Sequence, residues 1–280
     1  MSAPSLNPHL SPPINPLAMT KTLFGHWGLI LGLSQREVIG RYRGSVFGLL
    51  WSFINPLLML VVYTFVFSVV FKARWVGGSE SKTEFALALF TGLMVFNLFA
   101  ECVIRAPGLI LSNVNYVKKV IFPLEVLPIV SLISAMFHYC ISLIVWTIFY
   151  FVFFGVPDFG VFLLPIALFP FCLLILGMTW FLSSLGVYLR DISQVIGILT
   201  TMLMFLSPIF YPIEALPDVY RPLMELSPLT SMVVQVRDLM LWGKGMDWSA
   251  WTTQLIVSST VAWLGFAWFQ KTRKGFADVI

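Results

Sequence analysis

The amino-acid sequence predicts an all-α integral membrane protein with six transmembrane helices. Of the 280 residues, 59% are hydrophobic and 11% are charged, whereas a soluble domain carries about 25% charged residues. Apolar runs reach the roughly 20 residues that a helix needs to cross a bilayer, and in lipid they form helices because the backbone must satisfy its own hydrogen bonds. One transmembrane domain, residues 22–280, would hold the six spans: 49–71, 85–105, 129–154, 161–189, 192–211 and 250–270.

A surface helix is predicted ahead of the first span, over residues 22–47. Apolar side chains recur there at helical spacing, while Glu37, Arg41 and Arg43 belong to a polar side. This pattern is typical of an amphipathic helix that lies in a membrane interface. Residues 1–21 are rich in proline, serine and asparagine, so we expect them to form a flexible cytoplasmic tail.

Three glycines recur at a spacing of four residues where the predicted surface helix ends, namely Gly40, Gly44 and Gly48. On one continuous helix they would form a smooth strip that another backbone can approach closely. Alternatively, they form a hinge between the surface helix and the first span.

The distribution of lysine and arginine orients the predicted helices. With the N-terminus in the cytoplasm, the larger share of the basic residues falls in cytoplasmic segments, as the positive-inside rule requires. We therefore expect both termini in the cytoplasm. In that orientation Pro107–Gly108 and Pro123 bracket a short cytoplasmic stretch that includes Lys118 and Lys119. This stretch is either a short helix on which a soluble partner docks or an ordinary connecting loop.

The segment after the fifth predicted span is external in this orientation, yet apolar. Pro208 and Pro212 end the helix, and residues 213–241 contain two short amphipathic stretches separated by Ser227–Pro228. Irregular backbone is tolerated at membrane depth when it is buried in protein or lines a cavity. We predict two short re-entrant helices that dip into the outer leaflet or cover a pathway.

Two titratable residues lie inside predicted spans. Glu101 is an intramembrane carboxylate, which indicates a functional site by default, but it also lies one helical turn before Arg105 and can pair with it. His138 has no carboxylate near it in sequence. It is therefore either a hydrogen-bonded core histidine or part of a proton relay.

Several chemistries have no signal in the sequence. There is no GxxxxGK[ST] phosphate-binding loop and no HExxH or GxSxG motif, so energy for uphill transport would come from another chain. The three cysteines are Cys102, Cys140 and Cys172, and they are interpreted as small buried hydrophobes. The net charge of +4 is too small and too scattered to indicate a nucleic-acid partner. We expect this chain to bind no metal and no cofactor.

Five stretches of the sequence resemble one family. RYRGSVFGLLWSFINPLLMLVVYTFVFSVVFK, residues 41–72, is similar to the start of the membrane subunit of type 2 ABC exporters, in the branch for bacterial surface polysaccharides such as O-antigen, capsule and teichoic acid. The resemblance includes LSNVNYVKKVIFPLEVLP (111–128), YLRDI (188–192), LSPIFYPIEALP (206–217) and the closing KTRKGFADVI.

The resemblance implies an assembly and a cargo. The chain would work as a homodimer in the bacterial inner membrane, with two copies of a cytoplasmic ATPase subunit that binds ATP and Mg²⁺. The cargo would be a polysaccharide, most simply O-antigen, linked through pyrophosphate to a polyprenyl lipid. Residues 213–241 would match the periplasmic gate helices, and the family's ATPase coupling helix would match Ser112, Asn113, Asn115, Tyr116, Lys118 and Lys119.

Two further sets of residues are candidates for contact with the cargo. Arg41 and Arg43 can bind the lipid pyrophosphate where it enters, because arginine binds phosphate in a bidentate manner; ordinary phospholipid headgroups explain them equally well. Aromatic rings can stack on sugars, although any one of them can instead face lipid or the core. The candidate aromatic residues of the channel are Phe53, Tyr63, Phe96, Phe99 and Tyr211.

The sequence therefore predicts the transmembrane subunit of an ATP-driven exporter of lipid-linked O-antigen. An exporter of a drug or a small lipid is the alternative within the same family. A membrane-embedded transferase that acts on a polyprenyl lipid is the alternative of another class, and only Glu101 is a candidate catalytic residue for it.

Overall fold

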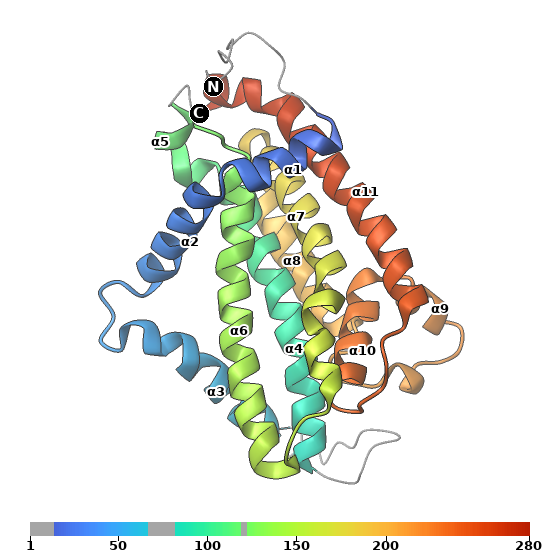
Figure 1. Cartoon of the computed structure of the whole chain (residues 1–280). Helices are drawn as coiled ribbons and strands as arrows, with labels where there is room; N and C mark the ends of the chain where they lie inside the picture. Colours follow the sequence, from blue (N-terminus) through green and yellow to red (C-terminus); the bar gives the residue numbers. More distant parts are fainter. Residues whose placement is uncertain (1–13, 67–81, 119–121) are drawn as a thin grey trace.

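The computed structural model describes residues 14–66, 82–118 and 122–280, and within these residues all regular structure is helical (Figure 1). The central helix of the bundle is α4, which packs against α6, α7, α8 and α10. The principal helices are α1 (Pro16–Gly25), α2 (Trp27–Tyr42), α3 (Trp51–Tyr63), α4 (Lys82–Arg105), α6 (Val126–Phe154), α7 (Leu164–Tyr188), α8 (Ile192–Leu206), α10 (Pro228–Met240) and α11 (Trp248–Thr272).

Four helical stretches among the described residues have the length and composition to cross a membrane: Gly48–Val66, Thr83–Gly108, Val126–Phe154 and Phe159–Tyr188. The predicted span over 192–211 is a shorter apolar helix, α8, with 15 residues. It ends at Leu206 because Pro208 lacks an amide hydrogen with which to continue the helix. α11 has 25 residues and packs along α7.

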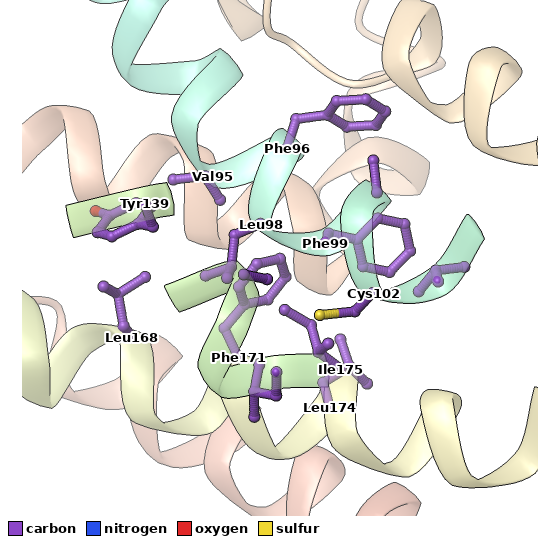
Figure 2. Packing of buried hydrophobic residues seen from close by; sticks show 14 of the residues in the cluster. Val95, Phe96, Leu98, Phe99, Cys102, Tyr139, Leu168, Phe171, Leu174 and Ile175 are labelled. Carbon is purple, nitrogen blue, oxygen red and sulfur yellow. The ribbon is translucent and has the colours of Figure 1, made fainter. Parts of the chain in front are cut away.

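The core lies around α4. Within the span Thr83–Gly108, which contains α4, 78% of the most apolar 18 residues are buried. The corresponding share is 11% for the span Gly48–Val66, which contains α3. Figure 2 shows Leu98, Phe99 and Cys102 of α4 among side chains that include Phe171 and Ile175 of α7. α4 is therefore an internal helix, whereas α3 presents most of its apolar surface outward.

α7 and α11 approach each other closely at two glycines, Gly177 and Gly265. A Cβ atom on Gly265 of α11 would collide with the backbone of Gly177 on α7, and a Cβ atom on Gly177 would lie 2.5 Å from the carbonyl oxygen of Val261. Small residues at such a crossing let two backbones pack directly on each other.

The predicted glycine strip is wrong, because the helix that would carry it ends at Tyr42. Gly44 and Gly48 have φ angles of +85° and +52°, a backbone geometry that interrupts an α-helix and suits glycine. No atom lies within 4 Å of a Cβ atom built on Gly40, Gly44 or Gly48. Gly44 and Gly48 instead form the bend that joins α2 to α3, as in the hinge alternative.

The predicted surface helix over 22–47 is two helices, α1 and α2, which meet at His26. α2 packs against α6 and buries Ile30, Ser34 and Val38, which recur one helical turn apart. Figure 1 shows α2 and α3 beside α6, with the bend between them.

Short helices lie at both ends of the bundle (Figure 1). α5 (Val114–Val117) lies near α1 and the C-terminus, where α12 (Phe276–Val279) ends the chain. α9 (Arg221–Glu225) and α10 lie in the half away from α5, and α10 begins at Pro228 after Ser227. Residues 213–241 thus hold a 3-10 turn, Ile213–Ala215, and the two helices α9 and α10.

Candidate functional site

Six polar side chains from three helices meet where α2 packs on the bundle. This polar cluster consists of Glu37, Arg41 and Tyr42 of α2, Glu101 and Arg105 of α4, and His138 of α6.

Two ion pairs cross between α2 and α4 in the polar cluster. Arg41 Nη2 lies 2.6 Å from Glu101 Oε1, and Arg105 Nη2 lies 2.5 Å from Glu37 Oε1. Each helix carries one acid and, a turn later, one base. The acid of each helix pairs with the base of the other helix. The predicted contact of Glu101 with Arg105 exists as a longer one, 3.7 Å, within α4.

His138 joins α6 to both other helices of the polar cluster. Its Nδ1 lies 3.1 Å from each carboxylate oxygen of Glu101, and its Nε2 lies 3.1 Å from the hydroxyl of Tyr42. The pKa of Tyr42 is raised, chiefly by burial, so its hydroxyl stays protonated and donates to Nε2. Nδ1 faces the Glu101 carboxylate, and Arg41 Nη1 lies 3.1 Å from the same nitrogen, while Nη2 of Arg41 makes the ion pair with Glu101.

Glu101 and His138 are the most screened from solvent of the charged and imidazole side chains in the polar cluster. The side chains of Glu101 and His138 are 18% and 16% exposed. With a neutral histidine, two carboxylates balance two guanidinium groups, so no net charge is left in the low-dielectric interior. Glu101 is thus held as a paired carboxylate, which disfavours its use as a catalytic acid or base in a transferase.

The two candidate arginines of the cargo entrance have different surroundings. Arg41 is committed to Glu101 and its side chain is 34% exposed. Arg43 follows the last residue of α2 and is exposed, with no ion pair or side-chain hydrogen bond among the described residues. Of the two, Arg43 is the one whose guanidinium group is available to an anionic lipid.

The candidate coupling element follows α4 as a chain of short helices that ends in α5. Ser112, Asn115 and Lys118 are exposed in it. Asn113 is half-buried and donates from Nδ2 to the carbonyl of Leu109 at 2.9 Å. The half-buried ring of Tyr116 stacks on Phe122, with ring centroids 4.3 Å apart; Lys119 lies outside the described residues. The hydroxyl of Ser112 donates to the carbonyl of Leu109 at 3.1 Å, so Asn115 and Lys118 are the exposed side chains best placed to meet a partner.

The prediction of channel-lining aromatics is wrong for Phe96 and Phe99. Each is only 4% exposed, because α4 is the central helix; Figure 2 shows Phe99 among the packed side chains. Phe99 stacks on Phe171 with ring centroids 6.3 Å apart. Phe53 is half-buried, and the hydroxyl of the half-buried Tyr211 donates to the carbonyl of Leu206 at 2.6 Å.

The remaining candidate aromatic residue, Tyr63, lines a cavity of about 590 Å³ bounded by α3, α4 and α6. Glu101, Arg105 and His138 of the polar cluster also line it. The cavity therefore adjoins the polar cluster, while most of the side chains around the rest of it are apolar.

Arg237 of α10 is a buried cation that sequence reasoning missed. It is 1% exposed, and its guanidinium donates to the carbonyl groups of Ala88, Ile209 and Pro208, the first two at 2.7 Å. Gly92 leaves room for the guanidinium group. Its position among the apolar side chains of the amphipathic helix α10 is the signal in the sequence that indicates burial.

A partly buried ion pair anchors the C-terminal segment. Arg273 Nη1 lies 2.7 Å from Glu125 Oε2, and Glu125 is 7% exposed at the start of α6. Phe276 of α12 is fully buried. The closing sequence KTRKGFADVI therefore folds back onto the bundle near α5.

The fold and the polar cluster together define an all-helical, multi-pass membrane protein whose surface helix is joined to its core by charge. The family model of the ABC-2 type transporter matches residues 29–241. The chain belongs to the ABC-2 type transporter family, as a membrane component, and in this family ATP is hydrolysed by a separate subunit. The resemblance to type 2 ABC exporters is thereby confirmed.

Curated relatives extend the similarity over nearly the whole chain. The O-antigen export system permease protein RfbA of Myxococcus xanthus is 27% identical over 266 residues, which cover 94% of this chain and 100% of the relative. A protein of the same name from Klebsiella pneumoniae is 25% identical over 253 residues, which cover 90% of this chain and 95% of the relative.

Proposed function

We propose that this chain is the transmembrane subunit of an ATP-driven exporter that moves O-antigen, linked to polyprenyl pyrophosphate, across the bacterial inner membrane. The observation that carries the proposal is the match to two O-antigen export permeases over at least 90% of this chain and 95% of each relative. Such end-to-end similarity within one transporter family supports the same kind of cargo.

The working unit in this proposal is a homodimer with two ATPase subunits. α3 and α8 each expose a row of large apolar side chains, which supports a second copy or lipid against these faces. α8 and α11 complete six spans, both termini are cytoplasmic, and α9 and α10 form the periplasmic gate. ATP and Mg²⁺ bind the partner subunit rather than this chain.

The mechanism follows from which helices are joined. The ATPase contacts α5 and the surface helices. The crossed ion pairs Glu37–Arg105 and Arg41–Glu101 hold α2 to α4, so a displacement of α2 moves the central helix with it. Arg237 holds the gate helix α10 to the same α4. One internal helix thus connects the ATPase side with the gate, and Arg43 can guide the lipid pyrophosphate near α2.

The test is export in the native host. Deletion of the gene should leave lipid-linked O-antigen inside the cell, and expression of the intact chain should return it to the surface. The chain should also co-purify with an ATPase. Normal surface O-antigen after deletion would contradict the proposed cargo, and a chain that exports a drug or a small lipid would be recognised in the same cells by loss of resistance or of that lipid.

A further inference from the structure

Two asparagines face the cavity between α3, α4 and α6. Asn55 comes from α3 and Asn97 from the middle of α4, and both line the cavity. Both residues are exposed within this single chain, and neither side chain has a hydrogen-bond partner among the described residues. The hydroxyl of Tyr139 is likewise unpaired there, although the residue is only 4% exposed and lines the same cavity.

Unpaired amides are costly inside a membrane protein. No water is available in the hydrocarbon region to bond to them, and polar residues within spans face cavities rather than lipid. Pro56 adds a further polar group at this wall, because it lacks the amide hydrogen that would bind the carbonyl of Ser52 one turn earlier; both residues line the cavity. The cavity thus presents several hydrogen-bonding groups without partners.

The chemistry of these groups selects the occupant. Glu101 and Arg105 line the cavity and pair within the polar cluster, although Arg105 Nη1 makes no hydrogen bond among the described residues. The two amides and the Tyr139 hydroxyl are neutral donors and acceptors. A hydrocarbon chain would leave both amides unpaired, and a small anion would find no cation without a carboxylate beside it. A sugar hydroxyl both donates and accepts, as an amide does.

We propose that this cavity is a binding site for a neutral, hydroxylated sugar unit, in which Asn55 and Asn97 hydrogen-bond the sugar. Its volume of about 590 Å³ lies within the roughly 300–1,000 Å³ of small-molecule sites. The inference rests on the proposed function, and it identifies which residues touch the transported glycan. Because the contacts are amides rather than charges, the site recognises hydroxyl groups and not the pyrophosphate.

The test uses the full chain with its ATPase subunit, reconstituted in lipid nanodiscs. The probe is the oligosaccharide released by mild acid from the host's own surface polysaccharide, and its binding is measured by calorimetry. The double variant Asn55→Leu/Asn97→Leu should weaken binding by about tenfold or more. Thr260→Leu removes an exposed hydroxyl on α11 that bonds only to its own helix, and it should bind the probe as the unaltered chain does. Each single variant should show an intermediate loss, which keeps the test informative if the double variant does not assemble.

Several results would overturn the inference. Equal binding by the intact chain and the Asn→Leu variants, or no binding by an intact chain that exports glycan, would show that sugar does not occupy the cavity. Lipid that co-purifies at this site and is retained or increased in the Asn→Leu variants would assign the cavity to a hydrocarbon chain. An intact chain that exports no glycan in its host would instead contradict the proposed function, so the two failures are distinguishable.

Discussion

His138 on α6 and Glu101 on α4 are 37 residues apart in the sequence, yet the imidazole Nδ1 lies 3.1 Å from both carboxylate oxygens. The histidine fills the space between the carboxylate and the hydroxyl of Tyr42, so it links α6 to both α4 and α2. Both ring nitrogens of His138 have a neighbour within hydrogen-bond distance. A structural role as a hydrogen-bonded core histidine therefore explains this residue without a proton relay.

The crossed ion pairs predict strong coupling between Arg41 and Glu101. Glu101→Gln leaves two guanidinium groups without their shared carboxylate and should lower stability by about 2 kcal/mol, less than the 3–5 kcal/mol of a fully buried pair because the side chains keep some solvent. Arg41→Gln should cost a similar amount, and the double variant should cost clearly less than the two together. Thermal unfolding of the purified chain measures all three.

The exposed pair of Arg221 with Asp218 provides the control for this prediction. Asp218 is 88% exposed, so Asp218→Asn should change stability by less than about 1 kcal/mol. Strictly additive losses at Arg41 and Glu101 would show that the polar cluster does not act as one unit.

The local features of the fold could be predicted from the sequence, whereas the contacts between distant residues could not. Long apolar runs indicate membrane-spanning helices, so the helical architecture follows from composition. The short helix near Tyr116 follows from the positions of the prolines on either side of it. The partners of Glu101 are different, because Arg41 and His138 lie far from it along the chain and a single sequence carries no signal of their meeting. Phe96 and Phe99 illustrate a second limit: an apolar helix inside the bundle and one that faces lipid or a channel have the same composition.

The packing of α7 on α11 predicts that Gly265 tolerates no side chain. Gly265→Ala places a Cβ atom against the backbone of Gly177, and because backbone cannot rotate away, the two helices must separate. We expect a loss of about 1–3 kcal/mol, as for other overpacked sites, measured as a lower unfolding temperature. Gly40→Ala is the matched control, since nothing lies within 4 Å of its Cβ position and alanine favours a helix. A larger loss of stability for Gly40→Ala than for Gly265→Ala would contradict this prediction and support close packing at Gly40.

Arg237 is predicted to hold the gate helix through geometry as well as charge. Arg237→Met removes three hydrogen bonds and should lower stability by about 3 kcal/mol, or roughly 1 kcal/mol for each lost hydrogen bond. Arg237→Lys should recover only part of this loss, because a single ammonium group cannot reproduce the planar fork that reaches Ala88, Pro208 and Ile209. Limited proteolysis between α8 and α10 should be faster in both variants. The control is Arg190→Met, which replaces an exposed arginine at a turn. Full recovery of stability by Arg237→Lys would contradict the role of geometry.

The exposed side of the coupling element predicts where the ATPase docks. Lys118 is exposed next to α5, so Lys118→Glu reverses a charge at the proposed interface without removing any buried contact of the bundle. The ATPase should bind this variant roughly tenfold more weakly, as expected for like charges brought together across an interface, while the unfolding temperature of the chain stays unchanged. Lys271→Glu reverses an exposed charge on the last turn of α11, near the same end of the bundle, and should leave ATPase binding intact. Equal losses for the two variants would mean that the net charge of this end attracts the ATPase, whereas a loss confined to Lys118 assigns the contact to the element around α5.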